Sequence, residues 1–254
     1  YPDYVRIGSI THPSGATASF RVGLQEHGLS QVSLSCQNYA IPDVVTADNS
    51  NLFPWAYWSW SLQHKEISGP GISPNLTWDY SYDYENGISL HPFSTAPLCT
   101  GAQCYQPWCT DDGCAGYSLT WVTLPDGSKE SYKFGTSWQY NEGKLLRIDR
   151  YNSTNVLLQT ESHRYDLDRS QAHAAYPTRY GTSFRINVDG FNSEYHRPEL
   201  ATVTTRDGVD FSWAIDACDP YACMDHFARP LQVTQSSTIV HGVTPGYTRL
   251  ENYS

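Results

Sequence analysis

Short runs in which apolar and polar residues alternate, each broken by a turn that contains glycine, recur along this chain. Three of them match one another: residues 10–20, 122–132 and 203–213. In each, β-branched residues lead into the turn, and an aromatic residue follows the turn glycine by five positions. Because side chains on a strand alternate between faces, an equal offset puts the three aromatics on the same face relative to their turns. The pattern predicts three similar β-hairpins, with tips at Gly15, Gly127 and Gly208 and aromatics at Phe20, Tyr132 and Trp213.

The residues at these tips suit the turns that they predict. Glycine supplies a positive φ at no steric cost, and the Asp or Ser before it can hydrogen-bond its own backbone. Residues 156–165 read as a further strand, and the segment NLTWDYSYDYENGISL puts four rings on one face: Trp78, Tyr80, Tyr82 and Tyr84. No window keeps a 3.6-residue apolar period for three turns, so only one short helical turn, at residues 168–175, is expected. The sequence predicts an all-β fold built by adding similar antiparallel β-ribbons.

Composition agrees with a sheet and argues against two kinds of partner. The 254 residues hold 19 Tyr and 8 Trp but a single Met, and flat, stiff side chains suit pleated sheets better than helical bundles. A net charge of -10 repels a phosphate backbone, so nucleic acid is not an expected partner. No run of 18 apolar residues is present, so no membrane span is expected. We expect one all-β repeat-type domain over residues 1–254, with an irregular cysteine-rich insertion at about 91–116.

Six of the seven cysteines fall into three pairs with the same spacing: Cys99 and Cys104, Cys109 and Cys114, Cys218 and Cys223. The residues inside each pair are turn formers, and a turn brings two Cα atoms within the distance that a disulfide requires. A zinc site built from the first two pairs is the alternative, although structural zinc prefers closer pairs with a longer spacer. Reduced buried thiols are a third interpretation. We favour disulfides, with Cys36 left as a free thiol, and oxidised pairs would place the protein outside the cytosol.

Several short motifs, taken in order, resemble the RHS or YD-repeat family. They are an apolar strand, a Pro-Asp-Gly turn and an aromatic strand in VTLPDGSKESYKF, a Gly-x-Leu segment in NEGKLLRIDRYN, and the Tyr165-Asp166 pair in HRYDLD. TVTTRDGVDFSW and DHFARPLQVTQSS are similar to the family's Asp-Gly and Arg-Pro segments. The resemblance covers about half of the chain, from about Leu119 to Ser237, plus the first hairpin.

The resemblance implies a twisted, partly spiral sheet of long antiparallel hairpins. The cysteine-rich insertion is polar and lacks periodicity, so its own residues predict a loop stapled by its disulfides. Full-length members wind such a sheet into a hollow shell around a polypeptide cargo. They are typically secreted or surface-associated bacterial proteins with adhesive or toxin-carrying roles, so an extracellular or cell-surface location is expected. This chain departs from the pattern because its repeats are degenerate and interrupted, and because Asp219-Pro220 is not followed by the family's Gly-Leu context. No cargo toxin is visible in it.

The densest aromatic stretch is LFPWAYWSWSL, residues 52–62. On a strand, Trp55 and Tyr57 face one way, whereas Trp58 and Trp60 face the other. If one pair stays exposed, its rings can stack on the apolar C–H faces of sugars, which predicts a carbohydrate-binding platform. The other interpretation is that neighbouring strands cover both pairs.

Catalysis by a carboxylate pair would need two acids with separated pKa values in one cleft. The candidates are Asp79, Asp83, Glu85, Asp216 and Asp219. Acidic residues beside Tyr and Gly are mostly turn formers, and no Gly-x-Ser-x-Gly, His-Glu-x-x-His or phosphate-binding glycine loop is present. Asp225 and His226 could ligate a metal, although a structural hydrogen bond is the favoured interpretation. We therefore predict no catalytic residue, no metal site and no cofactor.

These observations predict a non-catalytic structural or binding module of a secreted RHS-type protein. Such a module would form part of a β shell or surface appendage, contact other segments of a longer chain, and touch carbohydrate through exposed aromatics. Two alternatives stay open: a glycosidase that acts on polysaccharide through a carboxylate pair, and a stand-alone lectin-like carbohydrate-binding protein.

Overall fold

A computed structural model of the chain describes residues 5–28, 56–83, 116–137, 140–167, 176, 179–180, 194–218, 221–238 and 248–252. The regular structure in these residues is all β-strand and none of it is helical, which confirms the predicted fold class. The large sheet contains β1 (Val5–Thr11), β2 (Thr17–Gly28), β3 (Ala56–Gly69), β4 (Ile72–Asp83), β5 (Tyr117–Thr123), β6 (Lys129–Gly135), β7 (Leu145–Tyr151), β8 (Leu157–Tyr165), β11 (Glu199–Arg206), β12 (Val209–Ile215), β15 (Gln232–Ser237) and β16 (Thr248–Asn252). Two small sheets pair β9 (Arg179–Tyr180) with β10 (Glu194–Tyr195), and β13 (Ala217–Cys218) with β14 (Tyr221–Ala222).

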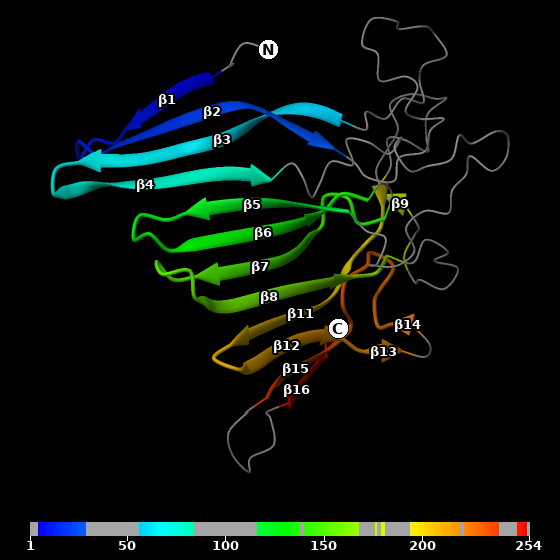
Figure 1. Cartoon of the computed structure of the whole chain (residues 1–254). Coiled ribbons are helices and arrows are strands. Elements are labelled where there is room, and N and C mark those ends of the chain that lie inside the picture. The colour runs from blue at the N-terminus through cyan, green and yellow to red at the C-terminus, as the bar shows by residue number, and fades with distance from the viewer. Residues whose placement is uncertain are drawn as a thin grey trace, which may run out of the picture.

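Strand order in the large sheet is the order of the chain, from β1 at one end to β16 at the other, and neighbouring strands are antiparallel (Figure 1). Short turns join β1 to β2, β3 to β4, β5 to β6, β7 to β8 and β11 to β12, and these turns all lie on one side of the sheet. The strands β2, β4, β6 and β8 end on the other side, where the connection from β6 to β7 is described at residues 136–137 and 140–144. The strands β1 and β16 are not paired with each other, so the sheet is open rather than closed into a barrel.

The three predicted glycines lie at hairpin tips. Gly15, Gly127 and Gly208 have φ values of 85°, 80° and 75°, a region that a Cβ atom disfavours. Asp207 also has a positive φ, of 52°, so the tip between β11 and β12 has the two left-handed residues of a type I′ turn. At the tip between β5 and β6, Oδ1 of Asp126 accepts the backbone N–H of the residue two positions later at 2.9 Å. The turn chemistry predicted from the sequence is therefore confirmed.

The strand register puts the three repeat aromatics on one face of the sheet. Residues directly opposite each other in an antiparallel pair lie on the same face, and alternate residues of one strand share a face. Following partners from strand to strand in this way leads from Phe20 on β2 to Tyr132 on β6 and on to Trp213 on β12. We call this side of the sheet the aromatic face. It also carries Trp78, Tyr80, Tyr82 and Phe211.

Two tyrosines tie the ends of their hairpins in the same way. The hydroxyl of Tyr82 donates to the carbonyl of Leu62 at 2.7 Å, and the hydroxyl of Tyr165 donates to the carbonyl of Leu145 at 2.9 Å. Each bond joins the return strand of a hairpin to the outgoing strand across a separation of 20 residues. An aspartate follows each tyrosine in the sequence. The β3–β4 and β7–β8 hairpins are therefore built as similar units.

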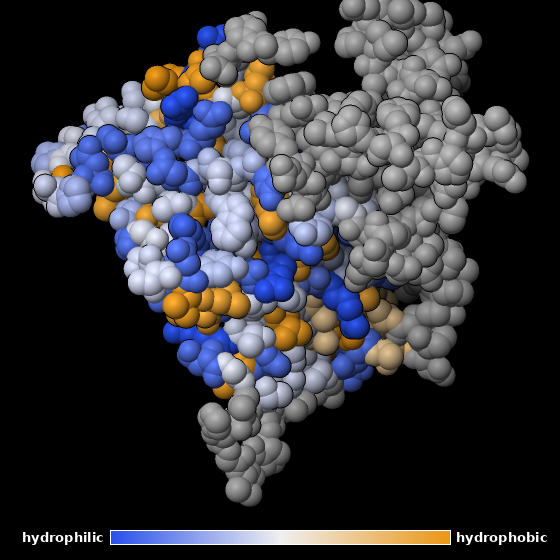
Figure 2. Space-filling view, viewed as in Figure 1, coloured by the Kyte–Doolittle hydropathy of each residue, from blue (hydrophilic) through white to orange (hydrophobic). Residues whose placement is uncertain are grey.

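The sheet is thin, and few of its side chains are fully buried. In the described residues each strand of the large sheet makes its main contacts with its neighbours in the order. Val233 is fully buried, but Ile7, Leu157 and Phe211 keep about half or more of their surface exposed. Figure 2 shows apolar and polar residues interleaved on the visible side. The contacts of the described strands are therefore mainly cross-strand pairs with their neighbours in the sheet.

Several predictions fall outside the described residues: Tyr84, the turn at 168–175, and the cysteines Cys36, Cys99, Cys104, Cys109 and Cys114. In the part of the chain that is described, there is no helix long and apolar enough to cross a membrane.

Candidate functional site

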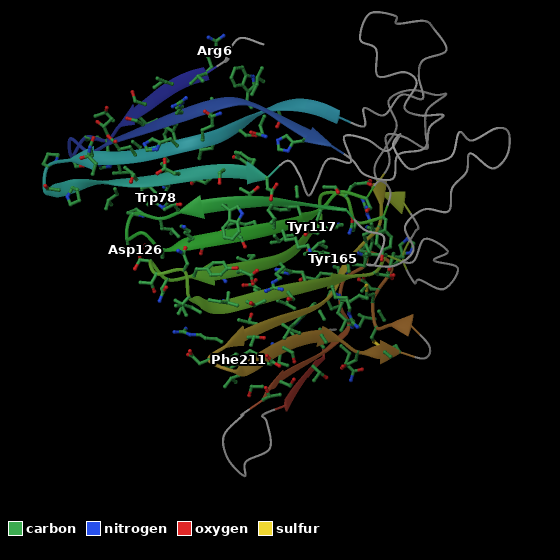
Figure 3. The ribbon with its side chains drawn as sticks, viewed as in Figure 1. Arg6, Trp78, Tyr117, Asp126, Tyr165 and Phe211 are labelled. Carbon is green, nitrogen blue, oxygen red and sulfur yellow. A yellow bond between two sulfur atoms is a disulfide. The ribbon has the colours of Figure 1, made fainter. Side chains whose placement is uncertain are left out.

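The predicted aromatic platform is described only at Trp60, on β3. Half of the Trp60 surface is exposed (50%), and the guanidinium carbon of Arg6 lies 5.9 Å from its ring centre in a cation–π contact. Figure 3 shows Arg6 on β1, at the end of the sheet. Trp55 and the side chains of Tyr57 and Trp58 lie outside the described residues, so their exposure stays a prediction.

The candidate acids do not form a carboxylate pair where they are described. Asp79 and Asp83 are both on β4, about 13 Å apart at the usual strand rise of about 3.3 Å per residue. The two carboxyl groups of a glycosidase are about 5–9.5 Å apart. Asp216 follows β12, and several strands separate it from β4 in the sheet. The remaining candidates, Glu85 and Asp219, lie outside the described residues.

Two acids of this set, Asp79 and Asp216, and the candidate metal ligand Asp225 serve as hydrogen-bond acceptors of their surroundings. Oδ1 of Asp79 lies 2.6 Å from Nδ1 of His64 on the adjacent strand, and Oδ1 of Asp216 accepts the hydroxyl of Thr234 at 2.8 Å. Asp225 accepts two backbone N–H groups of its own turn and the guanidinium of Arg229. That guanidinium bond is the largest cause of a lowered Asp225 pKa. Asp225 therefore holds a turn, in agreement with the structural interpretation of the sequence.

One of the three predicted cysteine pairs lies in the described residues. Cys218 and Cys223 form a disulfide with a Cα–Cα distance of 4.7 Å, and they close the β13–β14 hairpin. The predicted pairing is confirmed at this position.

A polar ladder that the sequence did not predict crosses the aromatic face on four adjacent strands. Arg150 of β7 donates to Glu130 of β6 at 3.1 Å and to Glu161 of β8 at 3.2 Å. His163 then lies 3.4 Å from an oxygen of Glu161 and 2.6 Å from an oxygen of Glu199 on β11. Each carboxylate of the ladder faces a cationic or imidazole group. The ladder is therefore a cross-strand clamp in which the acids are engaged with partners.

Two tyrosines beside the ladder have strongly raised pKa values. Burial is the main cause for Tyr132, and the hydrogen bond from its hydroxyl to Glu130 (2.5 Å) adds to it, so that its pKa rises to about 12. Burial and then the charge of Glu199 raise the pKa of Tyr165 to about 12. Both phenols keep their protons near neutral pH and act as hydrogen-bond donors.

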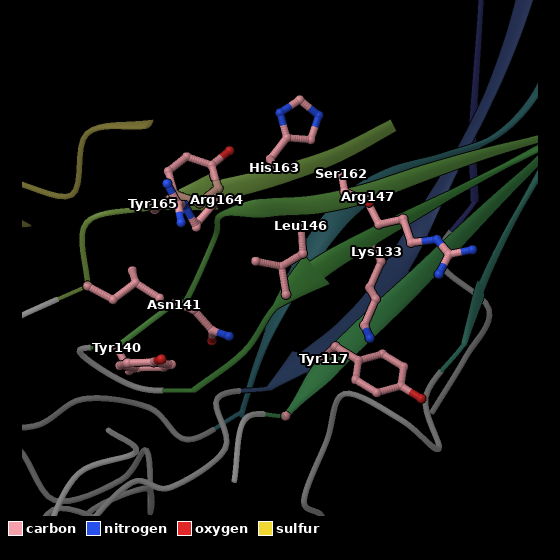
Figure 4. A pocket seen from close by; sticks show the side chains of 12 residues that line it. Tyr117, Lys133, Tyr140, Asn141, Leu146, Arg147, Ser162, His163, Arg164 and Tyr165 are labelled. Carbon is pink, nitrogen blue, oxygen red and sulfur yellow. The ribbon is translucent and has the colours of Figure 1, made fainter. Parts of the chain in front are cut away.

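A cavity of about 430 Å³ lies at the end of β5–β8 that is opposite the hairpin tips (Figure 4). It is lined by Gly116, Tyr117, Lys133, Tyr140, Asn141, Leu146, Arg147, Ser162, His163, Arg164, Tyr165 and Leu167. Connections between hairpins begin and end here, and binding residues of proteins are commonly carried at such loop ends of a rigid sheet.

Three cations of this cavity lie on three neighbouring strands: Lys133 on β6, Arg147 on β7 and Arg164 on β8. Lys133 and Arg147 are direct cross-strand partners, and like charges directly opposite each other destabilise a sheet. Nζ of Lys133 lies 3.8 Å from the ring centre of Tyr117, and Nε of Arg147 donates to Asp149 at 2.8 Å. These contacts offset the repulsion only in part, because Asp149 is paired with Arg147 alone and no described carboxylate is paired with Lys133 or Arg164.

Asn141 lines the same cavity from the connection between β6 and β7, and it is fully buried. Its Oδ1 accepts the backbone N–H of Ser137 at 2.9 Å. It packs closely on Gly135, where an added Cβ would lie 2.5 Å from its Cγ. Its Nδ2 has no hydrogen-bond acceptor among the described residues. A buried donor left unpaired costs about 1–3 kcal/mol.

Neither the ladder nor the cavity was predicted from the sequence. Their members are scattered along the chain with no local spacing that marks a site, and only the strand register brings them together. No group of three or more metal-ligating side chains comes together in the described ranges.

Comparisons with known proteins add no relative to this picture. No family model, no curated protein and no solved structure matches the chain.

Proposed function

We propose that the chain is a non-catalytic architectural module of a secreted RHS-type protein, in which successive β-ribbons build one continuous wall. The observation that carries the proposal is the identity of strand order and chain order in one open antiparallel sheet. Each new hairpin adds to the edge left by the previous one, so a longer chain extends the wall by the same rule. The Cys218–Cys223 disulfide supports an oxidising location.

The repeated tyrosine ties support the resemblance to YD-repeat proteins. Tyr82 and Tyr165 each precede an aspartate, and each closes its own hairpin with a hydroxyl-to-carbonyl bond over 20 residues. A Tyr-Asp pair at the end of a return strand thus has a physical role in this chain, because the tyrosine holds together the end of the hairpin that lies away from its turn.

The open edge at β1 suits the addition of another ribbon. In a hairpin, alternate residues of the outer strand point their N–H and C=O groups away from the partner strand. β1 carries no proline, and its Ile7 and Ile10 are 80% and 69% exposed. Protein edges that stay solvent-exposed are usually blunted by prolines, bulges or charges. Among the described residues this edge has a partner strand on one side only, its pairing with β2 has no bulge, and its one charged side chain, Arg6, lies against the ring of Trp60. The edge also offers two exposed apolar side chains. It is therefore fitted to pair with a neighbouring segment of a longer chain.

The edge is tested by sedimentation velocity of the unaltered chain and of Ser9→Pro. Counting back from the bond between His12 and Ala16 (2.8 Å), the N–H of Ser9 faces away from β2, so proline removes an outward donor and leaves the ladder intact. We expect concentration-dependent self-association of the unaltered chain that weakens in Ser9→Pro, with circular dichroism as the control for folding. A monomer at every concentration, identical for both proteins, would contradict the pairing role of this edge.

Carbohydrate contact is a second candidate function, and the half-exposed ring of Trp60 favours it. It predicts retention on a glycan panel that is lost in Trp60→Ala while the fold is kept. The glycosidase alternative is tested on the same panel by the release of reducing ends. Turnover that disappears when one aspartate is changed to asparagine would overturn the non-catalytic proposal.

A further inference from the structure

We propose that the cavity at the ends of β5–β8 binds an anionic saccharide, a sugar that carries its charge as a carboxylate or a sulfate ester. This site goes beyond the architectural role and does not depend on the open β1 edge. Four features of the cavity carry the inference: its cations, its free donors, its aromatic rings and its place on paired strands.

The cations are concentrated against the charge of the whole chain. The protein has 16 Lys and Arg against 26 Asp and Glu, yet Lys133, Arg147 and Arg164 line one cavity. In Figure 4, Lys133 and Arg147 lie on one side of Leu146, and Arg164 lies on the other. Positive charge therefore borders the cavity from two sides, and an anion between them would relieve the repulsion of the Lys133–Arg147 cross-strand pair.

The cations keep donors available for a ligand. The side chain of Arg164 makes no ion pair or hydrogen bond with any described residue, and Arg147 uses only its Nε, toward Asp149. The carboxylates nearby are engaged elsewhere as well. Asp149 also accepts the hydroxyl of Thr160 at 2.7 Å, and Glu142 faces Arg197 at 3.5 Å. Planar guanidinium groups bind carboxylate and sulfate oxygens with two parallel hydrogen bonds.

Neutral donors accompany the charged ones. Nδ2 of Asn141 is buried without an acceptor among the described residues, and Ser162 adds an exposed hydroxyl two positions before Arg164. The rings of Tyr117 and Tyr140 border the same space. An excess of donors beside aromatic rings suits a ligand that is rich in oxygen acceptors and has apolar C–H faces, which describes an acidic sugar.

The position of the cavity argues against an acidic peptide and against nucleic acid. An extended peptide binds most simply at a free strand edge, but β6 and β7 are paired on both sides. A phosphate backbone would have to track a basic surface, whereas the net charge of the chain is -10. A volume of about 430 Å³ lies within the usual range for small-molecule sites, about 300–1,000 Å³. A single anionic sugar unit at the end of the sheet fits these limits.

The test is isothermal titration of the full chain with four probes: tetragalacturonate, a sulfated galactan tetrasaccharide, neutral maltotetraose and hexaglutamate. The variants are Arg164→Gln and, as a control with the same loss of charge, Arg206→Gln, whose side chain is 67% exposed beside a hairpin tip. We expect at least one anionic saccharide to bind, Arg164→Gln to weaken it about tenfold, and Arg206→Gln to change it less than about twofold, since the lost bond is charge-assisted. Binding of the carboxylate probe alone or the sulfate probe alone identifies the anion.

Three outcomes would overturn the proposal. Equal binding of maltotetraose would show that charge plays no part. Equal weakening of saccharide binding by Arg164→Gln and Arg206→Gln would show that the saccharide responds to the overall charge of the protein and not to this cavity. Binding of hexaglutamate with the same dependence on Arg164 would show that the cavity recognises an acidic chain and not a sugar. No binding of either anionic saccharide would show that the cavity is not a saccharide site.

Discussion

Gly135, at the end of β6, leaves no room for a side chain, and Gly135→Ala tests how rigidly the connection to β7 is built. An added Cβ would lie 2.3 Å from the carbonyl oxygen of Asn141, although non-bonded heavy atoms are most stable about 3.5–4.0 Å apart. A backbone shift of about 1 Å is needed to relieve this contact. The shift is resisted by the hydrogen bonds from Gly135 N–H to Lys144 (2.9 Å) and from Gly143 N–H to Gly135 (3.0 Å).

The expected cost is about 2–3 kcal/mol of unfolding free energy. Overpacking costs about 1–3 kcal/mol and each hydrogen bond lost about 1 kcal/mol, while alanine returns about 0.5–1 kcal/mol over glycine in a strand. The measurement is urea unfolding followed by tryptophan fluorescence, with the slope of the transition as a check on the unfolded state. Gly8→Ala is the matched control, because a Cβ there meets nothing within 4 Å, and it should be neutral or slightly stabilising. A loss below about 1 kcal/mol in Gly135→Ala would refute the reasoning, since the connection would then be able to yield.

Three further predictions follow from the hydrogen bonds and ionisation of the sheet. Tyr82→Phe and Tyr165→Phe should each lower the unfolding free energy by about 1 kcal/mol, because each removes one hydrogen bond at a separate hairpin. The two losses should add in the double variant when it is measured by urea unfolding. A loss in the double variant that differs strongly from the sum would contradict the independence of the two hairpins. The ordinary pKa of a tyrosine is 10.0, and the fold raises the pKa of Tyr132 to about 12. The unfolded state therefore loses its proton first, and stability falls as pH rises from about 10 to 12. After a discount for solvent screening this loss is about 1 kcal/mol. Tyr132→Phe should therefore flatten the alkaline part of the curve of unfolding free energy against pH. An unchanged curve would show that the fold does not raise the pKa of this phenol. Replacing both Cys218 and Cys223 by serine should lower the unfolding free energy by about 2 kcal/mol in thermal or urea unfolding, because the disulfide closes a loop with a sequence separation of 5. An unchanged unfolding free energy would show that the disulfide does not stabilise the fold.

Much of the fold could be predicted because its signals are local. The glycine tips at Gly15, Gly127 and Gly208 follow from turn chemistry that involves four or five neighbouring residues. The aromatic offset after each tip follows from the two-residue period of a strand, and the register confirms that Phe20 and Trp213 share a face. The Cys218–Cys223 disulfide spans a single tight turn and could be predicted for the same reason.

The candidate site could not be predicted in the same way. The sequence pointed to the aromatics near Trp60 and to acids such as Asp79, and the described acids form no carboxylate pair. The ladder around Arg150 and the cavity between Lys133 and Arg164 draw on strands whose pairing is invisible in the residues themselves. Their chemistry exists only when three or four strands lie side by side.

The sequence by itself therefore determined the element type, the turns and the face that each repeat aromatic takes relative to its own turn, because these depend on backbone preferences and side-chain period over a few residues. The tertiary structure alone decided which strand lies beside which, and so which charges meet. Bulges between Lys133 and Phe134 and between Arg150 and Tyr151 shift the register within single strand pairs. A shift of one residue moves a side chain to the other face, so the balance of long-range pairing, rather than any local motif, brought three cations to one cavity.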